Sequence, residues 1–241
     1  MSGQRRSLDD GELVRCEYGT IDRVLLRRLD RTAWLRGDDP WLIALAAIAE
    51  KRPALVLDAG SGAGDFSALI SAPKVCCVDS SHAAVGAAVR RGLDARVADI
   101  QALPLPDDHF DVVTCNWVLY HVSDRAGAIR EMARVLRPGG RFVGCYNAPG
   151  HLAEVWAAVG VRPRTDDFNS DNGPDQLAAC FAAVRAIPAH GEALWETRES
   201  LQTYLDAYRE FYGPLTAPHD SYPFIATRRN AVLVAEKSLG L

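Results

Sequence analysis

The pattern of apolar residues along the chain changes near residue 54. From there, five short apolar runs follow one another, at 54–58, 74–79, 95–99, 110–116 and 141–147. Continuous runs of this length are typical of strands that are buried on both faces of a parallel sheet. Helical stretches are predicted between most of them, at 64–71, 81–91 and 124–137. Because strand and helix alternate, the fold class is predicted to be α/β, with a doubly wound sheet and right-handed crossovers.

The two flanks of this region have different patterns. The first fifty residues are predicted to be helical, and Asp39-Pro40 has the N-cap and first-turn proline of a helix start. After residue 148 we expect a helix at 150–159, a strand at 182–189, an exposed amphipathic helix at 199–211 and a last strand at 224–237. The predicted sheet therefore has seven strands and is mostly parallel.

Composition and charge narrow the functional classes. The chain has 241 residues, of which 48% are hydrophobic and 24% charged, as is ordinary for a globular protein. No apolar run is long enough to span a bilayer, and the N-terminus lacks the apolar stretch of a signal peptide, so a cytoplasmic protein is expected. The net charge is −4 and the basic residues are scattered, which disfavours a nucleic-acid partner. The six cysteines form no C-x-x-C pair, so reduced cysteines and no metal site are expected.

The most informative motif is LVLDAGSGAGDFS, at 55–67. A predicted strand ends at Asp58, and Gly60, Gly62 and Gly64 follow at alternate positions before a predicted helix. Glycine lets the backbone turn sharply and approach a ligand, and a helix N-terminus attracts an anionic group. A dinucleotide fold would have G-x-G-x-x-G, but Asp65 stands at the sixth position of that pattern.

The G-x-G-x-G pattern after an acidic residue resembles the first motif of the class I S-adenosylmethionine-dependent methyltransferases, in their small-molecule branch. The resemblance continues in order through CVDSS, VADIQ, CNWVLYHV and ARVLRPGGRFV, and covers about 54–147. It implies a Rossmann-like methyltransferase fold that binds S-adenosylmethionine. It also implies two parts, a helical lid segment at 1–50 and a cofactor-binding α/β domain at 51–241, with a lid or substrate insertion around 190–220.

The resemblance carries cofactor roles to particular residues. Asp79 would accept the ribose hydroxyls, Asp99 would contact the adenine amino group with Ile100 against the ring, and Asn116 would reach the methionine part. Tyr18 would bond the methionine carboxylate from a segment folded over the cofactor. The candidate cofactor-binding residues are Tyr18, Asp58, Gly60, Ser61, Gly62, Gly64, Asp79, Ser80, Asp99, Ile100 and Asn116.

Each of these assignments has a structural alternative. Asp58 could be a cap or a solvated strand end, Asp79 the N-cap of the 81–91 helix, and Asp99 an ordinary loop acid. His121 could be a general base, with an unperturbed pKa near 6.5, or a residue packed beneath the cofactor. Five aromatic residues are candidates for an acceptor pocket, although most aromatic residues simply belong to a core: Trp117, Trp156, Trp195, Tyr208 and Tyr212.

The predicted function is methyl transfer from S-adenosylmethionine to a small molecule, in a setting such as secondary metabolism. The sequence leaves open whether oxygen, nitrogen or carbon is methylated. Two alternatives also stay open, because the motifs concern only the cofactor. One is a lyase or cyclase that uses the sulfonium without methyl transfer, and the other is a binding protein without catalysis.

Overall fold

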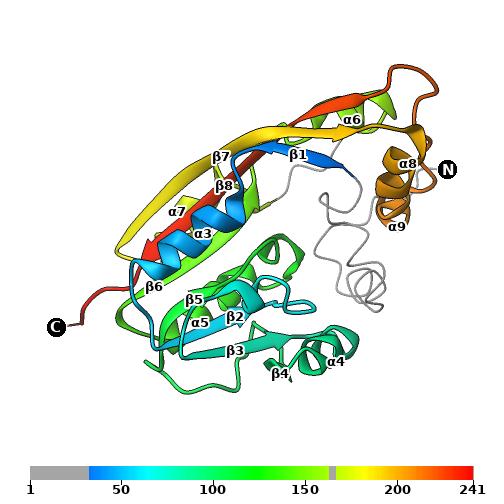
Figure 1. Cartoon of the computed structure of the whole chain (residues 1–241). Helices are drawn as coiled ribbons and strands as arrows, with labels where there is room; N and C mark the ends of the chain where they lie inside the picture. Colours follow the sequence, from blue (N-terminus) through cyan, green and yellow to red (C-terminus); the bar gives the residue numbers. More distant parts are fainter. Residues whose placement is uncertain (1–32, 163–166, 241) are drawn as a thin grey trace.

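The fold is built on one mixed sheet of eight strands in the order β1-β7-β8-β6-β5-β2-β3-β4 (Figure 1). This computed structural model describes residues 33–162 and 167–240. The strands are β1 (Trp34–Gly37), β2 (Leu55–Ala59), β3 (Lys74–Asp79), β4 (Asp94–Val97), β5 (Phe110–Thr114), β6 (Leu136–Asn147), β7 (Ala183–Trp195) and β8 (Phe224–Glu236). The helices and 3₁₀ turns are α3 (Pro40–Ala49), η2 (Ser67–Leu69), α4 (His82–Arg90), η3 (Leu119–His121), α5 (Arg125–Val135), α6 (Ala153–Ala158), α7 (Gly173–Leu177), α8 (Arg198–Asp206) and α9 (Arg209–Tyr212).

The sheet has a parallel half and an antiparallel half. β2 pairs in parallel with β3 and β5, β3 with β4, and β5 with β6. The remaining pairings, β6 with β8, β8 with β7 and β7 with β1, are antiparallel. The five apolar runs of the sequence form the parallel half, so the doubly wound α/β class is confirmed. Because β2 lies between β3 and β5, the chain reverses its winding direction there, which is where open α/β sheets bind ligands.

Two expectations of secondary structure are wrong. Residues 34–37 form β1 rather than a helix, because they pair antiparallel with β7, and this gives an eighth strand. The predicted helix at 64–71 is reduced to the 3₁₀ turn η2. Gly64 before this turn is left-handed, with φ of 77°, and Ile70 directly after it is extended, with ψ of 119°, so the helical backbone is confined to a few residues.

Three apolar clusters stabilise the fold. Alternate residues of β6 and β8 face opposite sides of the sheet, as strand geometry requires. Phe142 and Leu233 pack on the side of α5, whereas Val143 and Val232 pack on the side of α3, which crosses the sheet in Figure 1. The third cluster packs α6 and α8 against the C-terminal end of β7 and the N-terminal part of β8. The helix predicted at 199–211 is therefore not simply exposed, and it is divided into α8 and α9.

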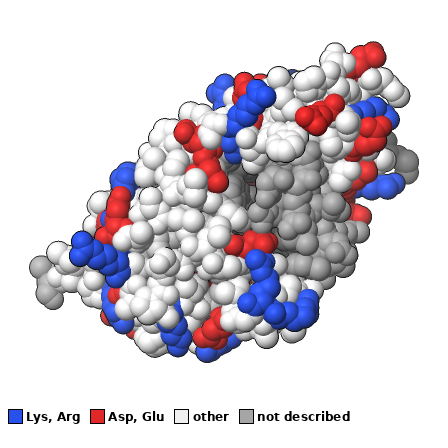
Figure 2. All heavy atoms as spheres, viewed as in Figure 1, with Lys and Arg blue, Asp and Glu red and all other residues white. Residues whose placement is uncertain are grey.

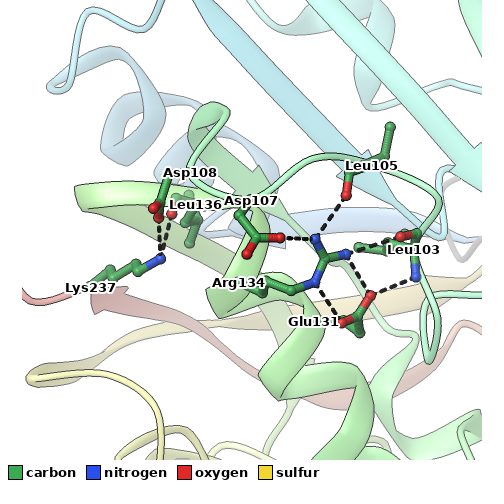
Figure 3. A network of polar contacts seen from close by, with 8 residues as sticks. All are labelled: Leu103, Leu105, Asp107, Asp108, Glu131, Arg134, Leu136 and Lys237. Carbon is green, nitrogen blue, oxygen red and sulfur yellow. Dashed lines mark hydrogen bonds and ion pairs between the residues drawn. The ribbon is translucent and has the colours of Figure 1, made fainter.

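Arg134 of α5 fixes the long loop between β4 and β5 (Figure 3). Its guanidinium donates to the carbonyl oxygens of Leu103 and Leu105, at 3.0 and 2.8 Å, and to the carboxylates of Asp107 and Glu131. Glu131 in turn accepts the backbone N–H of Leu103 at 2.7 Å. This network holds the loop that begins at Asp99. None of the helices in the described residues has the length and apolarity that a bilayer-spanning segment needs.

Candidate functional site

The glycine-rich segment at residues 60–66, called the glycine loop below, leaves the carboxyl end of β2. The backbone N–H groups of Gly60 and Ser61 both donate to the carbonyl oxygen of Val78, at 2.8 and 3.0 Å. These two bonds attach the loop to the end of β3. Because η2 is too short to present the N-terminus of a helix, the ligand-binding groups that the loop offers are its own amides and hydroxyl.

The three glycines of the loop serve different purposes. All have positive φ, at 77° for Gly60, 55° for Gly62 and 77° for Gly64. A Cβ on Gly60 would lie 2.4 Å from Val118, and one on Gly64 would lie 2.1 Å from Leu93, so a side chain at either position would force its neighbour to shift and would also strain the backbone. At Gly62 a Cβ would meet no atom of residues 33–162 or 167–240 within 4 Å. Gly62 therefore borders open space, into which its backbone can present a ligand-binding surface.

The carboxylate of Asp79 is hydrogen-bonded to the glycine loop. Its Oδ2 accepts the backbone N–H of Gly62 and its Oδ1 that of Ser81, both at 2.8 Å. Ser81, rather than Asp79, caps α4, since its hydroxyl oxygen accepts the N–H of Ala84 at 3.2 Å. The capping alternative for Asp79 is therefore wrong. Burial raises the pKa of Asp79, while the two N–H groups oppose that change. Each carboxylate oxygen keeps a lone pair for a further donor.

Asp58 lies beneath the loop rather than at a solvated strand end. It is 2% exposed, and its carboxylate accepts hydrogen bonds from Ser67 Oγ and from Thr114 Oγ1. Burial raises the pKa of Asp58 to about 6. Thr114 Oγ1 also accepts from Asn116 Nδ2 at 3.0 Å, so the chain of hydrogen bonds continues to the end of β5. Sequence reasoning missed both partners: Thr114 is 56 residues from Asp58, and Ser67 is 9 residues away, beyond the turn of the glycine loop.

The side chain of Asn116 makes hydrogen bonds to residues of the sheet. Besides its bond to Thr114, its Oδ1 accepts the backbone N–H of Cys145 at 2.8 Å. This ties the ends of β5 and β6 together. Asn116 thus occupies the predicted edge of the sheet, and its backbone and the second N–H of its side-chain amide are the groups that a ligand could use.

Asp99 and Ile100 begin the loop after β4. Asp99 is exposed and its Oδ1 accepts the backbone N–H of Gln101 at 2.9 Å, which stabilises the turn. Ile100 is buried and packs in the cluster beside α5. Gln101 Oε1 accepts the N–H of Asp124 at 2.8 Å, so this turn is also fixed to the start of α5. Ser80, next to Asp79, is exposed.

Ser61 is an exception to the rule that buried polar groups are hydrogen-bonded. Its Oγ has almost no exposed surface and no hydrogen-bond partner in the described part of the chain. Leaving a buried hydroxyl without a partner costs about 1–3 kcal/mol. The hydroxyl lies in the loop between Gly60 and Gly62, where a bound ligand with a hydrogen-bonding group would satisfy it.

His121 lies where the site meets the C-terminal helices. It ends η3, packs edge-on against Tyr120, and lies nearly parallel to Phe211 of α9, with ring centroids 6.4 Å apart and planes inclined by 18°. Sequence reasoning missed Phe211. Of the five aromatic pocket candidates, Trp156 and Trp195 are buried in the third cluster. The half-buried candidates are Trp117, Tyr208 and Tyr212.

The remaining predicted features concern Tyr18 and metals. Tyr18 and the segment before residue 33 lie outside the described residues, so their covering of the cofactor stays a prediction. Within 33–162 and 167–240, no group of three or more His, Cys, Asp and Glu side chains could hold a metal ion.

Comparison with known proteins places this site in a family. A family model described as "Methyltransferase domain" matches residues 57–144, from the end of β2 into β6. Demethylmenaquinone methyltransferase of Mycobacterium marinum is 39% identical over 174 residues, which cover 69% of this chain and 74% of that protein. The ubiquinone/menaquinone biosynthesis C-methyltransferase UbiE of Vibrio vulnificus is 38% identical over 187 residues, covering 70% of this chain and 71% of that protein.

The fold also matches solved structures. The crystal structure of YcgJ from Bacillus subtilis superposes with a TM-score of 0.62 at 21% identity, over 83% of this chain and 99% of that chain. The chain spans 48 to 60% of the lengths of three further curated methyltransferases that it matches. The ordered motifs, the sheet topology and the two relatives covered over more than two thirds of their length agree. The chain belongs to the class I S-adenosylmethionine-dependent methyltransferases, an enzyme family whose members use S-adenosylmethionine as the methyl donor.

Proposed function

We propose that this chain transfers the methyl group of S-adenosylmethionine to a ring-bearing small molecule. The observation that carries the proposal is the arrangement around the glycine loop. Asp79 is oriented by the amides of Gly62 and Ser81, and Ser61 Oγ is buried without a partner among the described residues. Both are groups that a ribose or an amino acid moiety can satisfy, so the residues present fit the cofactor.

Different residues of the chain would bind different parts of the cofactor. The N–H groups of Gly62 and Ser81 occupy one lone pair on each carboxylate oxygen of Asp79. Asp79 would accept the ribose hydroxyls with the lone pairs that remain. Gly62 would let the backbone approach the ligand, since no atom of the described part of the chain lies near its absent Cβ. Asp99 and Ile100 would hold the adenine at the end of β4. When bound, S-adenosylmethionine supplies a methyl group on a sulfonium, which is already electrophilic.

The acceptor would lie between the end of β5 and helix α9. The ring of His121 stacks on the buried ring of Phe211 at this place, and such aromatic surroundings would suit a flat apolar body. The relatives named for demethylmenaquinone and for ubiquinone and menaquinone biosynthesis support a ring-bearing acceptor. Holding acceptor and donor together supplies most of the rate, about 7–11 kcal/mol for well-oriented reactants. His121 would remove a proton where the acceptor is a hydroxyl.

The partners proposed with this function are small molecules. Figure 2 shows acidic and basic side chains interspersed over the visible face, without a basic stripe. Nucleic-acid binding normally needs such a stripe, because it releases counterions from the phosphate backbone. The charge distribution therefore supports a small-molecule acceptor.

The test is the identity of the product that the cofactor leaves behind. The pure protein is incubated with S-adenosylmethionine alone, and then with a panel of reduced naphthoquinones, phenols, amines and secondary metabolites. We expect S-adenosylhomocysteine to form only when an acceptor is present, as measured by chromatography and mass spectrometry. Methylthioadenosine formed steadily without any acceptor, above the spontaneous rate, would contradict methyl transfer.

The same assay tests His121 against a matched control. His121→Ala should lower turnover of a hydroxyl acceptor about 10²–10⁴-fold if His121 is the base. His109, which is exposed and packs on Phe110, offers the control His109→Ala, with turnover expected to stay at the wild-type value. Equal turnover in both variants would exclude His121 from proton removal.

A further inference from the structure

Trp117 has an unusual backbone conformation for its residue type. Its φ is +54°, in the left-handed region where a bulky L residue is kept only by its surroundings. The residue lies directly after Asn116, at the junction between the end of β5 and η3. A strained residue at a junction changes the direction of the chain, so the segment that follows depends on what holds it.

Hydrogen bonds to β6 hold Trp117 in place. Its backbone N–H donates to the carbonyl oxygen of Cys145 at 2.9 Å. Its indole Nε1 donates to Asn147 Oδ1 at 3.0 Å, and the same oxygen accepts from Asn230 Nδ2 at 2.9 Å. Asn230 is buried, at 4% exposure. The indole is therefore attached to two neighbouring strands, β6 and β8, through one amide oxygen.

The turn at Trp117 directs Val118 against the glycine loop. A Cβ built on Gly60 would lie 2.4 Å from Val118 Cγ2, so the valine side chain occupies the space that glycine leaves. The chain then enters η3, where Leu119 is fully buried and His121 faces Phe211. Trp117 thus stands between the cofactor side of the site and its acceptor side.

We propose that Trp117 is a positioning residue. Its left-handed backbone, fixed by the bond from the indole to Asn147, holds Val118 against Gly60 and so sets the spacing between the glycine loop and η3. The inference rests on the proposed function for its purpose, which is to align an acceptor at η3 with the donor at the glycine loop.

The first test concerns the free protein and needs no ligand. Amide hydrogen exchange is measured for Trp117→Phe, which keeps a ring without the N–H, and for Asn147→Leu, which removes the acceptor. Both should speed exchange at 118–122 about 2–10-fold, the value of one lost hydrogen bond, while exchange at 110–114 stays unchanged. Asn147→Asp is the matched control, because its carboxylate still accepts from the indole, and it should restore slow exchange.

The coupling between the two residues is also measurable. The double variant Trp117→Phe with Asn147→Leu should exchange no faster than Asn147→Leu alone, because Asn147→Leu already removes the bond from the indole together with the bond from Asn230. Unchanged exchange at 118–122 in both single variants would overturn the proposal. So would Asn147→Asp behaving like Asn147→Leu, since that would indicate a packing role only.

The second test separates the backbone from the indole. Trp117→Ala and Trp117→Gly both remove the indole, but only glycine adopts a φ near +54° without strain. The alanine variant should leave the left-handed region, displace Val118 from Gly60, and bind S-adenosylhomocysteine several-fold more weakly than the glycine variant. Equal affinities in calorimetry would contradict the positioning role. A wild-type protein that binds no S-adenosylhomocysteine would contradict the proposed function instead, and the exchange measurements would still decide the role of Trp117.

Discussion

Replacing Asp58 by asparagine would remove an ionised carboxylate from beneath the glycine loop. Asp58 is 2% exposed, and burial raises its pKa from 3.8 to about 6 against the opposing hydrogen bonds from Ser67 and Thr114. Asparagine has nearly the same shape and can keep hydrogen bonds to both hydroxyls, because each hydroxyl can donate or accept. The substitution therefore changes the charge and leaves the packing in place.

The size and sign of the effect follow from proton linkage. Below about pH 4 the Asp58 carboxyl is protonated in both the folded and the unfolded chain. Between about pH 4 and 6 the unfolded chain has released this proton and the folded chain has kept it, so each pH unit costs the folded wild type about 1.4 kcal/mol. Above about pH 6 the cost is constant at about 3 kcal/mol, an upper value because the site relaxes.

The assay is urea unfolding of wild type and Asp58→Asn, without ligand, from about pH 4 to pH 8. Because every other titrating group is common to both proteins, the difference in the free energy of unfolding isolates Asp58. We expect the variant to gain on the wild type as the pH rises from 4 to 6, by up to about 3 kcal/mol, and then to stay at a constant advantage. A difference that is flat over the whole range would refute the perturbed ionisation of Asp58.

Two further predictions concern the loops that border the site. Ser61→Ala should weaken S-adenosylhomocysteine binding up to about tenfold in calorimetry without lowering the free energy of unfolding, since Ser61 Oγ has no partner to lose in the described residues. The control is Ser238→Ala, at an exposed serine after the end of β8, and a clear loss of stability in Ser61→Ala would contradict the argument. Arg134→Lys should lower the free energy of unfolding in urea by about 1–3 kcal/mol, because lysine cannot reproduce the forked contacts of Figure 3. The control is Arg130→Lys, whose exposed pair with Asp124 at 3.8 Å should be worth less than about 1 kcal/mol; equal losses in the two arginine variants would contradict the role of the network.

Most of the parallel half of the sheet could be predicted because β2, β3 and β5 contain continuous apolar runs, whereas β4, with the sequence DARV, is a mostly exposed edge strand. β1 could not, because all four of its residues, Trp34–Gly37, are exposed and their partner is the distant β7. A four-residue strand without an apolar run gives no local signal, and only the long-range pairing defines it. The opposite error occurred at 64–71, where a helix is predicted although Asp65, Phe66 and Ser67 are only moderate helix formers. With the left-handed Gly64 before them and the extended Ile70 after Leu69, only the 3₁₀ turn η2 forms.

The same division applies to the candidate site. The positions of Gly60, Gly62 and Asp79 at the carboxyl edge of the sheet could be predicted, because each lies at or shortly after the end of a predicted strand. The support of Asp58 by Thr114, 56 residues away, could not be predicted, nor could the contact between His121 and Phe211. These contacts depend on which strands are neighbours and on how α9 returns to the end of β5. Their distance along the chain hides them from any pattern of local spacing.

The central claim is that the cofactor binds at the carboxyl ends of β2 and β3, where Asp79 receives the ribose. The direct measurement is calorimetric titration of wild type and Asp79→Ala with S-adenosylhomocysteine, with Asp94→Ala on the neighbouring edge strand as the control. Because Asp79 would make two charge-assisted hydrogen bonds, each worth about 1.5–3 kcal/mol, its variant should bind at least about tenfold more weakly. The wild type and the control should bind one molecule per chain with equal affinity. An unchanged dissociation constant in Asp79→Ala, or no binding to the wild type, would contradict the claim.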